Sequence, residues 1–131
     1  TSDGRLIVGT QAGLFEVVGD RVESLGTDAG LPDSVDVTAL HELPGGELVV
    51  GTLTEEVFLL RGGRWTRFGA AQGMPVNSAF FITDDRQGYL WVAGIRGIQR
   101  VRLRDMQALA DGEVDRVQGE MLLNERGDRR G

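Results

Sequence analysis

Apolar, strand-like runs recur along this chain at a fixed spacing. The run Leu6–Gly9 returns as Leu48–Gly51 and again as Leu90–Ala93, 42 residues later each time. A period of about 40 to 45 residues with strand content in each unit is typical of β-propeller blades. A strand buried on both faces reads as a continuous apolar run, so we expect each run inside a sheet that lies between two neighbouring sheets.

Each apolar run is the second strand of its unit, and further strands are expected around it. First strands are predicted at Val35–Leu43 and Ala79–Thr83, and third strands at Gly13–Val18, Val57–Leu60 and Gly97–Val101. Outer strands, in which polar and apolar residues alternate, are predicted at Arg21–Leu25 and Arg64–Phe68. Turns rich in Gly, Pro and Asp separate these strands, as tight hairpin turns require. The sequence therefore predicts an all-β fold of about three four-stranded antiparallel units.

The third unit departs from this pattern. Residues Leu103–Ala110 have helical spacing and good helix formers, and Asp111–Gly112 ends the helix. We expect a short helix there, followed by an outer strand at Glu113–Val117. The apolar run Met121–Leu123 is then expected to begin the crossing to another blade.

The repeat divides the chain into blades of one partial propeller covering residues 1–131. Blade one (3–34) is incomplete because it enters at its second strand, blade two is 35–78, and blade three is 79–118. Residues 119–131 are expected to start the crossing to the next blade or to form a disordered tail. Propellers have about four to eight blades, so we expect a larger ring. Further blades or a second chain, as in a homo-oligomer, are expected to cover the exposed end faces.

Charge and composition exclude several classes of partner and site. The net charge is −6, which argues against nucleic acid and against an anionic membrane surface. The chain has no cysteine, so disulfides and thiolate metal sites are excluded. No apolar run approaches the roughly 20 residues of a membrane helix, so membrane attachment is expected only through segments outside this chain.

The chemically active side chains form no catalytic or metal-binding pattern in the sequence. His41, the single histidine, lies in a predicted first strand without a partner cluster, so a structural role is expected. The aspartates near the turns lack the spacing of a calcium loop. No serine has the G-x-S-x-G context of a nucleophile elbow. We therefore predict no catalytic residue, no metal site and no cofactor.

The candidates for ligand contact are few. Trp65 is expected on the outer rim, where an indole could stack on a sugar ring. Trp91 is expected in the core instead, with the following residues around it: Leu48, Val50, Phe58, Phe81, Ile82, Leu90 and Val92. Two polar corner loops repeat in phase and are interpreted first as turn caps, with ligand contact as the alternative: Asp33, Ser34, Asn77 and Ser78.

Several of these motifs carry a family resemblance. The stretch Asp85–Gly94 followed by Gly97-Ile98, and the corners Gly30–Ser34 and Gly73–Ser78, resemble the two-component regulator propeller repeat. The resemblance covers roughly residues 3 to 102, in phase with the 42-residue period. The tail is also similar to a segment of propeller sensors attached to diguanylate cyclases. The resemblance implies a seven-bladed ring outside the cytoplasm, joined through a membrane helix to a histidine kinase or diguanylate cyclase.

The expected function is therefore ligand sensing, without chemistry in this segment. The resemblance implies a periplasmic or extracellular position in a membrane-anchored signalling protein, and the ligand is expected to be small, with a saccharide as one option. Two alternatives remain open: a fragment of a propeller-type carbohydrate-active enzyme whose acidic residues lie elsewhere, and a protein-interaction scaffold. A membrane helix and a kinase or cyclase signature downstream would favour sensing, whereas a pair of inward-facing acids near the channel would favour the enzyme.

Overall fold

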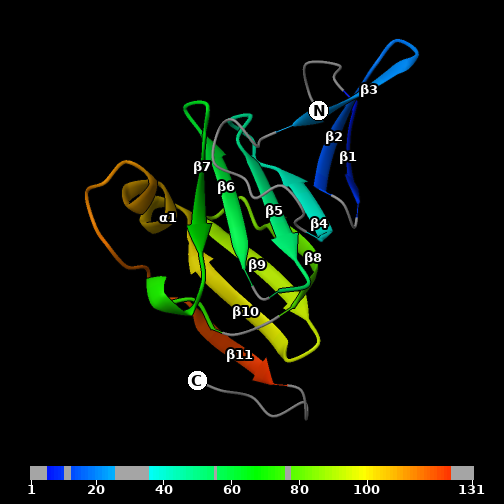
Figure 1. The fold of residues 1–131 in the computed structure, drawn as a ribbon. Coiled ribbons are helices and arrows are strands. Elements are labelled where there is room, and N and C mark those ends of the chain that lie inside the picture. Colours follow the sequence, from blue (N-terminus) through cyan, green and yellow to red (C-terminus); the bar gives the residue numbers. More distant parts are fainter. Residues whose placement is uncertain (1–5, 11–12, 26–35, 55, 76–77, 125–131) are drawn as a thin grey trace.

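Three antiparallel sheets make up most of the computed structural model, which describes residues 6–10, 13–25, 36–54, 56–75 and 78–124 (Figure 1). The first sheet contains β1 (Leu6–Thr10), β2 (Gly13–Val18) and β3 (Arg21–Leu25). The second contains β4 (Val37–Glu42), β5 (Leu48–Thr52), β6 (Val57–Arg61) and β7 (Arg64–Phe68). The third contains β8 (Ala79–Asp84), β9 (Tyr89–Gly94), β10 (Gly97–Arg102) and β11 (Glu120–Asn124). Two short helices complete the described elements: the 3-10 helix η1 (Ala70–Gln72) and α1 (Leu103–Ala110).

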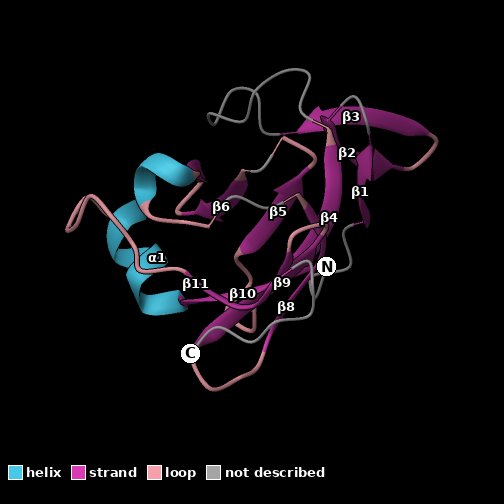
Figure 2. Cartoon of the chain, turned by 90° about the horizontal axis from the view of Figure 1, so that it is seen from below, coloured by secondary structure: helices cyan, strands magenta, loops and turns pink. Residues whose placement is uncertain are grey.

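Each sheet is a meander in which consecutive strands pair, so the predicted all-β fold of blade-like units is confirmed. Among the described residues the first sheet has three strands, and β4 and β8 supply a fourth, inner strand to the other two sheets. The one α-helix of the described residues has the predicted bounds. Figure 2 shows α1 beside the second and third sheets, at the opposite end of the chain's fold from β1, β2 and β3.

The outer strand of the third sheet is the main correction to the predicted elements. It is β11 (Glu120–Asn124), which pairs with β10, whereas the predicted position at Glu113–Val117 contains no strand. After α1, the chain runs along the η1 corner before it turns back to β10, and Val117 donates a 2.7 Å hydrogen bond to the Gln72 carbonyl. The apolar run Met121–Leu123, which was expected to leave the blade, therefore completes it.

The second sheet lies between the other two, and apolar clusters fill both interfaces. Towards the first sheet, Phe58 and Trp65 pack with Leu14. Towards the third, Leu59 and Phe68 pack with the buried side chains of β9 and β10. All five residues of β5 are consequently buried, which confirms the prediction of burial on both faces for this strand. Only one face of β9 is buried, because among the described residues no sheet covers its other face.

Repeated glycines allow neighbouring sheets to approach closely. A Cβ atom added to Gly51 would lie 2.6 Å from the Ala79 Cβ on the next sheet, well inside van der Waals contact. Gly9, one period earlier, faces Val37 in the same crowded way. The 42-residue period therefore reflects the contacts between neighbouring sheets as well as the order of the strands.

The expected core is largely confirmed, with corrections at three aromatic residues. Six of its members are buried: Leu48, Val50, Phe58, Ile82, Leu90 and Val92. Phe81 is 61% exposed, however, and Trp91 is half-buried, because both lie on the uncovered face of the third sheet. Trp65, expected on the rim, is only 8% exposed, since the first sheet covers its side of β7.

Large apolar side chains remain exposed at both ends of the stack. On the first sheet these are Leu6, Val8 and Val22, and on the third unit they are Phe80, Phe81 and Ile95. Exposed large apolar side chains that lie together often mark an interaction site. A covering blade or second chain stays a prediction.

Gln99 provides a stability test of the interface between the second and third sheets. It is 1% exposed, and its Oε1 atom accepts no hydrogen bond from the described residues. An unsatisfied buried acceptor costs about 1–3 kcal/mol. Gln99→Met, similar in volume, is expected to raise the free energy of unfolding by about 1 kcal/mol in urea denaturation. A destabilisation equal to that of Gln99→Ala would show that the amide is needed.

Candidate functional site

Two inner strands bring the single histidine next to a buried carboxylate. His41 on β4 and Asp84 on β8 occupy the ends of neighbouring inner strands, and their Nε2 and Oδ1 atoms lie 2.6 Å apart. The Asp84 side chain is 6% exposed and the imidazole 23% exposed. The other Asp84 oxygen accepts a 3.1 Å hydrogen bond from the Arg86 backbone. The pair therefore joins the second and third sheets and keeps one side of the imidazole open.

A hollow of about 240 Å³ opens beside this pair, between the β4–β5 and β8–β9 turns. It is lined by His41, Glu42, Leu43, Pro44, Asp84 and Arg86. The imidazole can donate or accept a proton, the carboxylate fixes its orientation, and the Arg86 guanidinium supplies a positive charge. This arrangement can bind a polar ligand, and it has the minimum parts for acid–base chemistry.

Asp85, the next residue, organises the β8–β9 turn. Its Oδ1 accepts hydrogen bonds from the backbones of Gln87 (2.7 Å) and Tyr89 (3.1 Å), and its Oδ2 accepts one from Trp91 Nε1 (3.0 Å). The Trp91 hydrogen bond is the main reason that the Asp85 pKa lies below its ordinary value of 3.8, with the backbone donors adding to it. The turn between the two hollows of this edge is thus held by one ionised carboxylate.

The lowered pKa of Asp85 predicts a pH-dependent contribution to stability. The folded state holds this proton less tightly than the unfolded chain, so ionised Asp85 stabilises the fold above its ordinary pKa of 3.8. The contribution is lost as the pH falls through the lower, folded value. We expect the stability difference between the wild type and Asp85→Asn to be constant above about pH 5 and to shrink below about pH 4 in urea denaturation. A difference that stays constant down to pH 2 would contradict this role.

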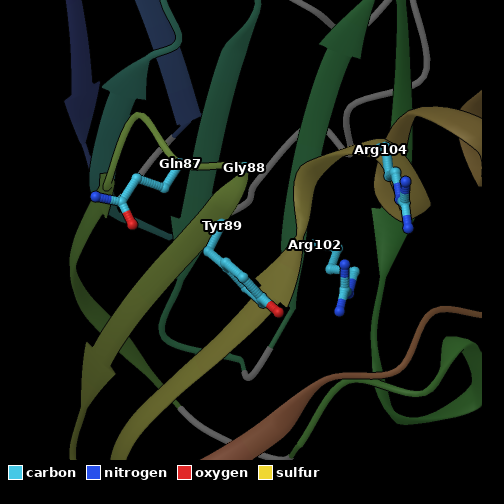
Figure 3. Close-up of a pocket in the computed structure, with 5 residues that line it drawn as sticks. All are labelled: Gln87, Gly88, Tyr89, Arg102 and Arg104. Atoms are coloured by element: carbon cyan, nitrogen blue, oxygen red, sulfur yellow. The ribbon is translucent and has the colours of Figure 1, made fainter.

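A second hollow, of about 180 Å³, lies on the other side of the same turn (Figure 3). It is lined by Gln87, Gly88, Tyr89, Arg102 and Arg104. Figure 3 shows the Tyr89 ring extending from β9 towards Arg102, with Arg102 and Arg104 at the junction of β10 and α1. The Arg102 guanidinium carbon lies 5.3 Å from the Tyr89 ring centroid, within cation–π distance.

A third hollow, of about 310 Å³, adjoins the second and shares Tyr89 and Arg102 with it. Its remaining lining is polar: Arg100, Asp105, Gln118, Gly119 and Glu120. Arg100 lies 4.4 Å from the Tyr89 centroid and donates a 2.8 Å hydrogen bond to Glu120, which raises the Arg100 pKa. The two adjoining hollows thus combine cations, carboxylates and two amides around one tyrosine.

The ligand-binding candidates from the sequence lie elsewhere. Trp65 is packed between the first and second sheets. Ser78 is 8% exposed and donates a 2.9 Å hydrogen bond to the Leu53 carbonyl, which agrees with its interpretation as a turn cap. Asp33, Ser34 and Asn77 fall outside the described residues. The sequence therefore did not predict the residues that line the three hollows as a site.

A weak signal for the His41–Asp84 pair existed in the sequence. The two residues are 43 apart, close to one period, and each lies in the last two residues of an inner strand. Inner strands of successive units lie side by side, so residues one period apart can meet. For the polar residues of β9 and β10, the signal was a difference between the units. Arg100 stands where blade two has the apolar Leu59, and Tyr89 stands where it has Glu47.

The described part of the chain contains neither a metal-binding cluster nor a membrane-spanning helix. No group of three or more His, Asp or Glu side chains is arranged to hold a metal ion there. Over the same residues, no helix is long and apolar enough to span a membrane.

Comparison with known proteins adds no identification. No protein-family model matches the chain, and no curated protein matches its sequence.

Proposed function

We propose that this chain is a propeller segment of an extracytoplasmic sensor, which binds a small ligand and performs no chemistry itself. The main support for this proposal is the edge of the molecule formed by the β4–β5 turn, the β8–β9 turn and the start of α1. Two hollows flank the β8–β9 turn on this edge, and both contain an exposed arginine. Loops held by a rigid scaffold are where binding residues usually lie.

The repeat supports the sensor proposal because it supplies such a scaffold. Close contacts at Gly51 and the buried clusters hold successive sheets in fixed register. A ligand that contacts two units would favour the relative placement of these units in which both contacts are made. This gives a physical route from binding to an output domain, which the resemblance to regulator propellers implies is a histidine kinase or diguanylate cyclase.

A thermal-shift screen of the native-length protein against saccharides and small metabolites tests the proposal. A ligand at a hundred times its Kd is expected to stabilise the folded state by about 2.7 kcal/mol. Binding without turnover, weakened by a substitution at this edge, would support sensing. A complete screen in which no compound raises the melting temperature would contradict it.

One observation favours a second function, that of a carbohydrate-active enzyme. The His41–Asp84 pair borders an open hollow, and a histidine oriented by a carboxylate is a common acid–base device. Turnover of a bound saccharide that disappears in His41→Gln, while the ligand still binds, would replace the sensor proposal by the enzyme. Retained binding in that variant separates lost chemistry from lost structure.

A further inference from the structure

The chain contains its own example of a carboxylate bound at a strand-end arginine. Arg61 ends β6, and both oxygens of Asp111, just after α1, accept hydrogen bonds from its Nε (3.0 Å) and Nη2 (3.2 Å). Its Nη1 donates a 2.7 Å hydrogen bond to Glu47. A two-pronged contact of this kind is the characteristic way in which arginine holds a carboxylate.

Arg102 is the counterpart of Arg61 in the third sheet. Leu60 pairs with Leu48, and Val101 pairs with Leu90, which lies one period after Leu48. The residue that follows each is an arginine at the end of its strand, Arg61 in one case and Arg102 in the other.

Arg102 differs from Arg61 in its contacts with carboxylates. Asp105 and Glu120 line the adjoining third hollow with it, but among the described residues Arg102 forms no hydrogen bond or ion pair with either. Tyr89 pairs with Arg102 and stands where Glu47 stands in the second sheet. In the described part of the chain neither Arg102 nor Arg104 forms an ion pair, and both side chains are exposed. The second hollow thus has the cations of a carboxylate site, with the Tyr89 ring within cation–π distance of Arg102.

We infer that this hollow binds the carboxylate of a small acidic ligand, with Arg102 as the two-pronged donor and Arg104 as the second cation. The inference rests on the proposed sensing function and names the chemical class of its ligand. The adjoining third hollow supplies hydrogen-bond acceptors from Asp105 and Glu120, and both a donor and an acceptor from the Gln118 amide. Such groups suit the hydroxyls of a sugar, so the class is an acidic saccharide of the uronic acid type.

This site would remain accessible if another blade packed onto the third sheet. The third sheet already packs onto the second, yet the Arg61 side chain is still 35% exposed there. Arg102 has the same strand-end position, at the edge of the interface. A covering blade would therefore border the hollow, and by analogy with Arg61 the Arg102 side chain would keep part of its exposure.

Isothermal titration of the native-length protein with glucuronate tests the inference, with glucose, inorganic sulfate and N-acetyl-aspartate amide as the other ligands. We expect glucuronate to bind at least about tenfold more tightly than each of the others. Arg102→Gln is expected to weaken glucuronate binding about tenfold or more, and Arg102→Lys to weaken it less, because lysine keeps the charge and loses the two-pronged contact. Arg64→Gln, an exposed arginine on β7 of the second sheet, is the matched control and should change nothing.

Equal binding of glucuronate and glucose would overturn the inference, as would unchanged glucuronate binding in Arg102→Gln. Tighter binding of sulfate or of the aspartate amide would overturn the assignment to an acidic saccharide. Failure here is distinguishable from failure of the sensor proposal, since a neutral ligand found in the thermal-shift screen would leave that proposal standing. An unchanged melting temperature in Arg102→Gln checks that the variant still folds.

Discussion

Replacing Trp65 by alanine is expected to lower the free energy of unfolding by about 3–5 kcal/mol, as for other large buried aromatics. The indole is 8% exposed and packs with Leu14 and Phe58 at the interface of the first two sheets. The first sheet has three strands, so the cavity removes a large share of its contact with the rest of the fold. Urea denaturation followed by circular dichroism would measure the loss.

Trp91→Ala is the matched control for this substitution. Trp91 is half-buried on the uncovered face of the third sheet, and its indole donates one hydrogen bond to Asp85. Its loss is expected to be less than half that of Trp65→Ala. An equal or larger loss would mean that a further unit covers the outer face of the third sheet in solution.

The contrast between these tryptophans shows where the sequence pattern falls short. The alternation of polar and apolar residues along β7 predicted one buried and one wet face, whereas Trp65 and Phe68 lie on opposite faces. Both residues are buried, because the second sheet is covered on each side. Periodicity gives the face on which a side chain lies, but the number of covered faces depends on how many sheets stack against it.

The strands themselves were predictable because packing is repeated. Gly9 and Gly51 each admit the inner strand of the next unit, so glycine recurs at this position in the two units that a further described sheet covers, whereas the third unit has Ala93. Prediction failed where the period is interrupted. The insertion of α1 moved the outer strand of the third sheet to Glu120–Asn124, beyond the stretch that the repeat assigned to it.

The candidate site was less predictable than the fold for a related reason. His41 and Asp84 lie on different sheets, and their contact depends on the distance between two inner strands. That Arg102 has no bound carboxylate becomes clear only when it is compared with Arg61. The carboxylate partner of Arg61, Asp111, is 50 residues away in the chain. The sequence assigned His41 a structural role and did not single out Arg102, because the neighbours of both residues depend on how the sheets are placed against one another.

Gly73→Ala is expected to destabilise the fold by several kcal/mol, because this position combines two demands. Its φ is +95°, a left-handed conformation that costs an alanine about 1–2 kcal/mol. An added methyl group would also overlap the backbone carbonyl oxygen of Val117, which cannot rotate away as a side chain could. Two backbone hydrogen bonds, from Val117 to Gln72 (2.7 Å) and from Gly119 to Gly73 (3.2 Å), tie these segments together.

Gly46→Ala is a control that separates the conformational cost at Gly73 from the steric clash with Val117. Gly46 has nearly the same φ, +93°, but no atom lies within 4 Å of the position that its Cβ would occupy. It should therefore lose only the conformational cost of about 1–2 kcal/mol, and the excess in Gly73→Ala measures the clash with Val117. Because the Val117 segment leads directly into β11, hydrogen exchange of the β10–β11 amides should rise in Gly73→Ala and stay unchanged in Gly46→Ala. Equal losses in the two variants would show that the 111–119 segment does not pack against the η1 corner in solution.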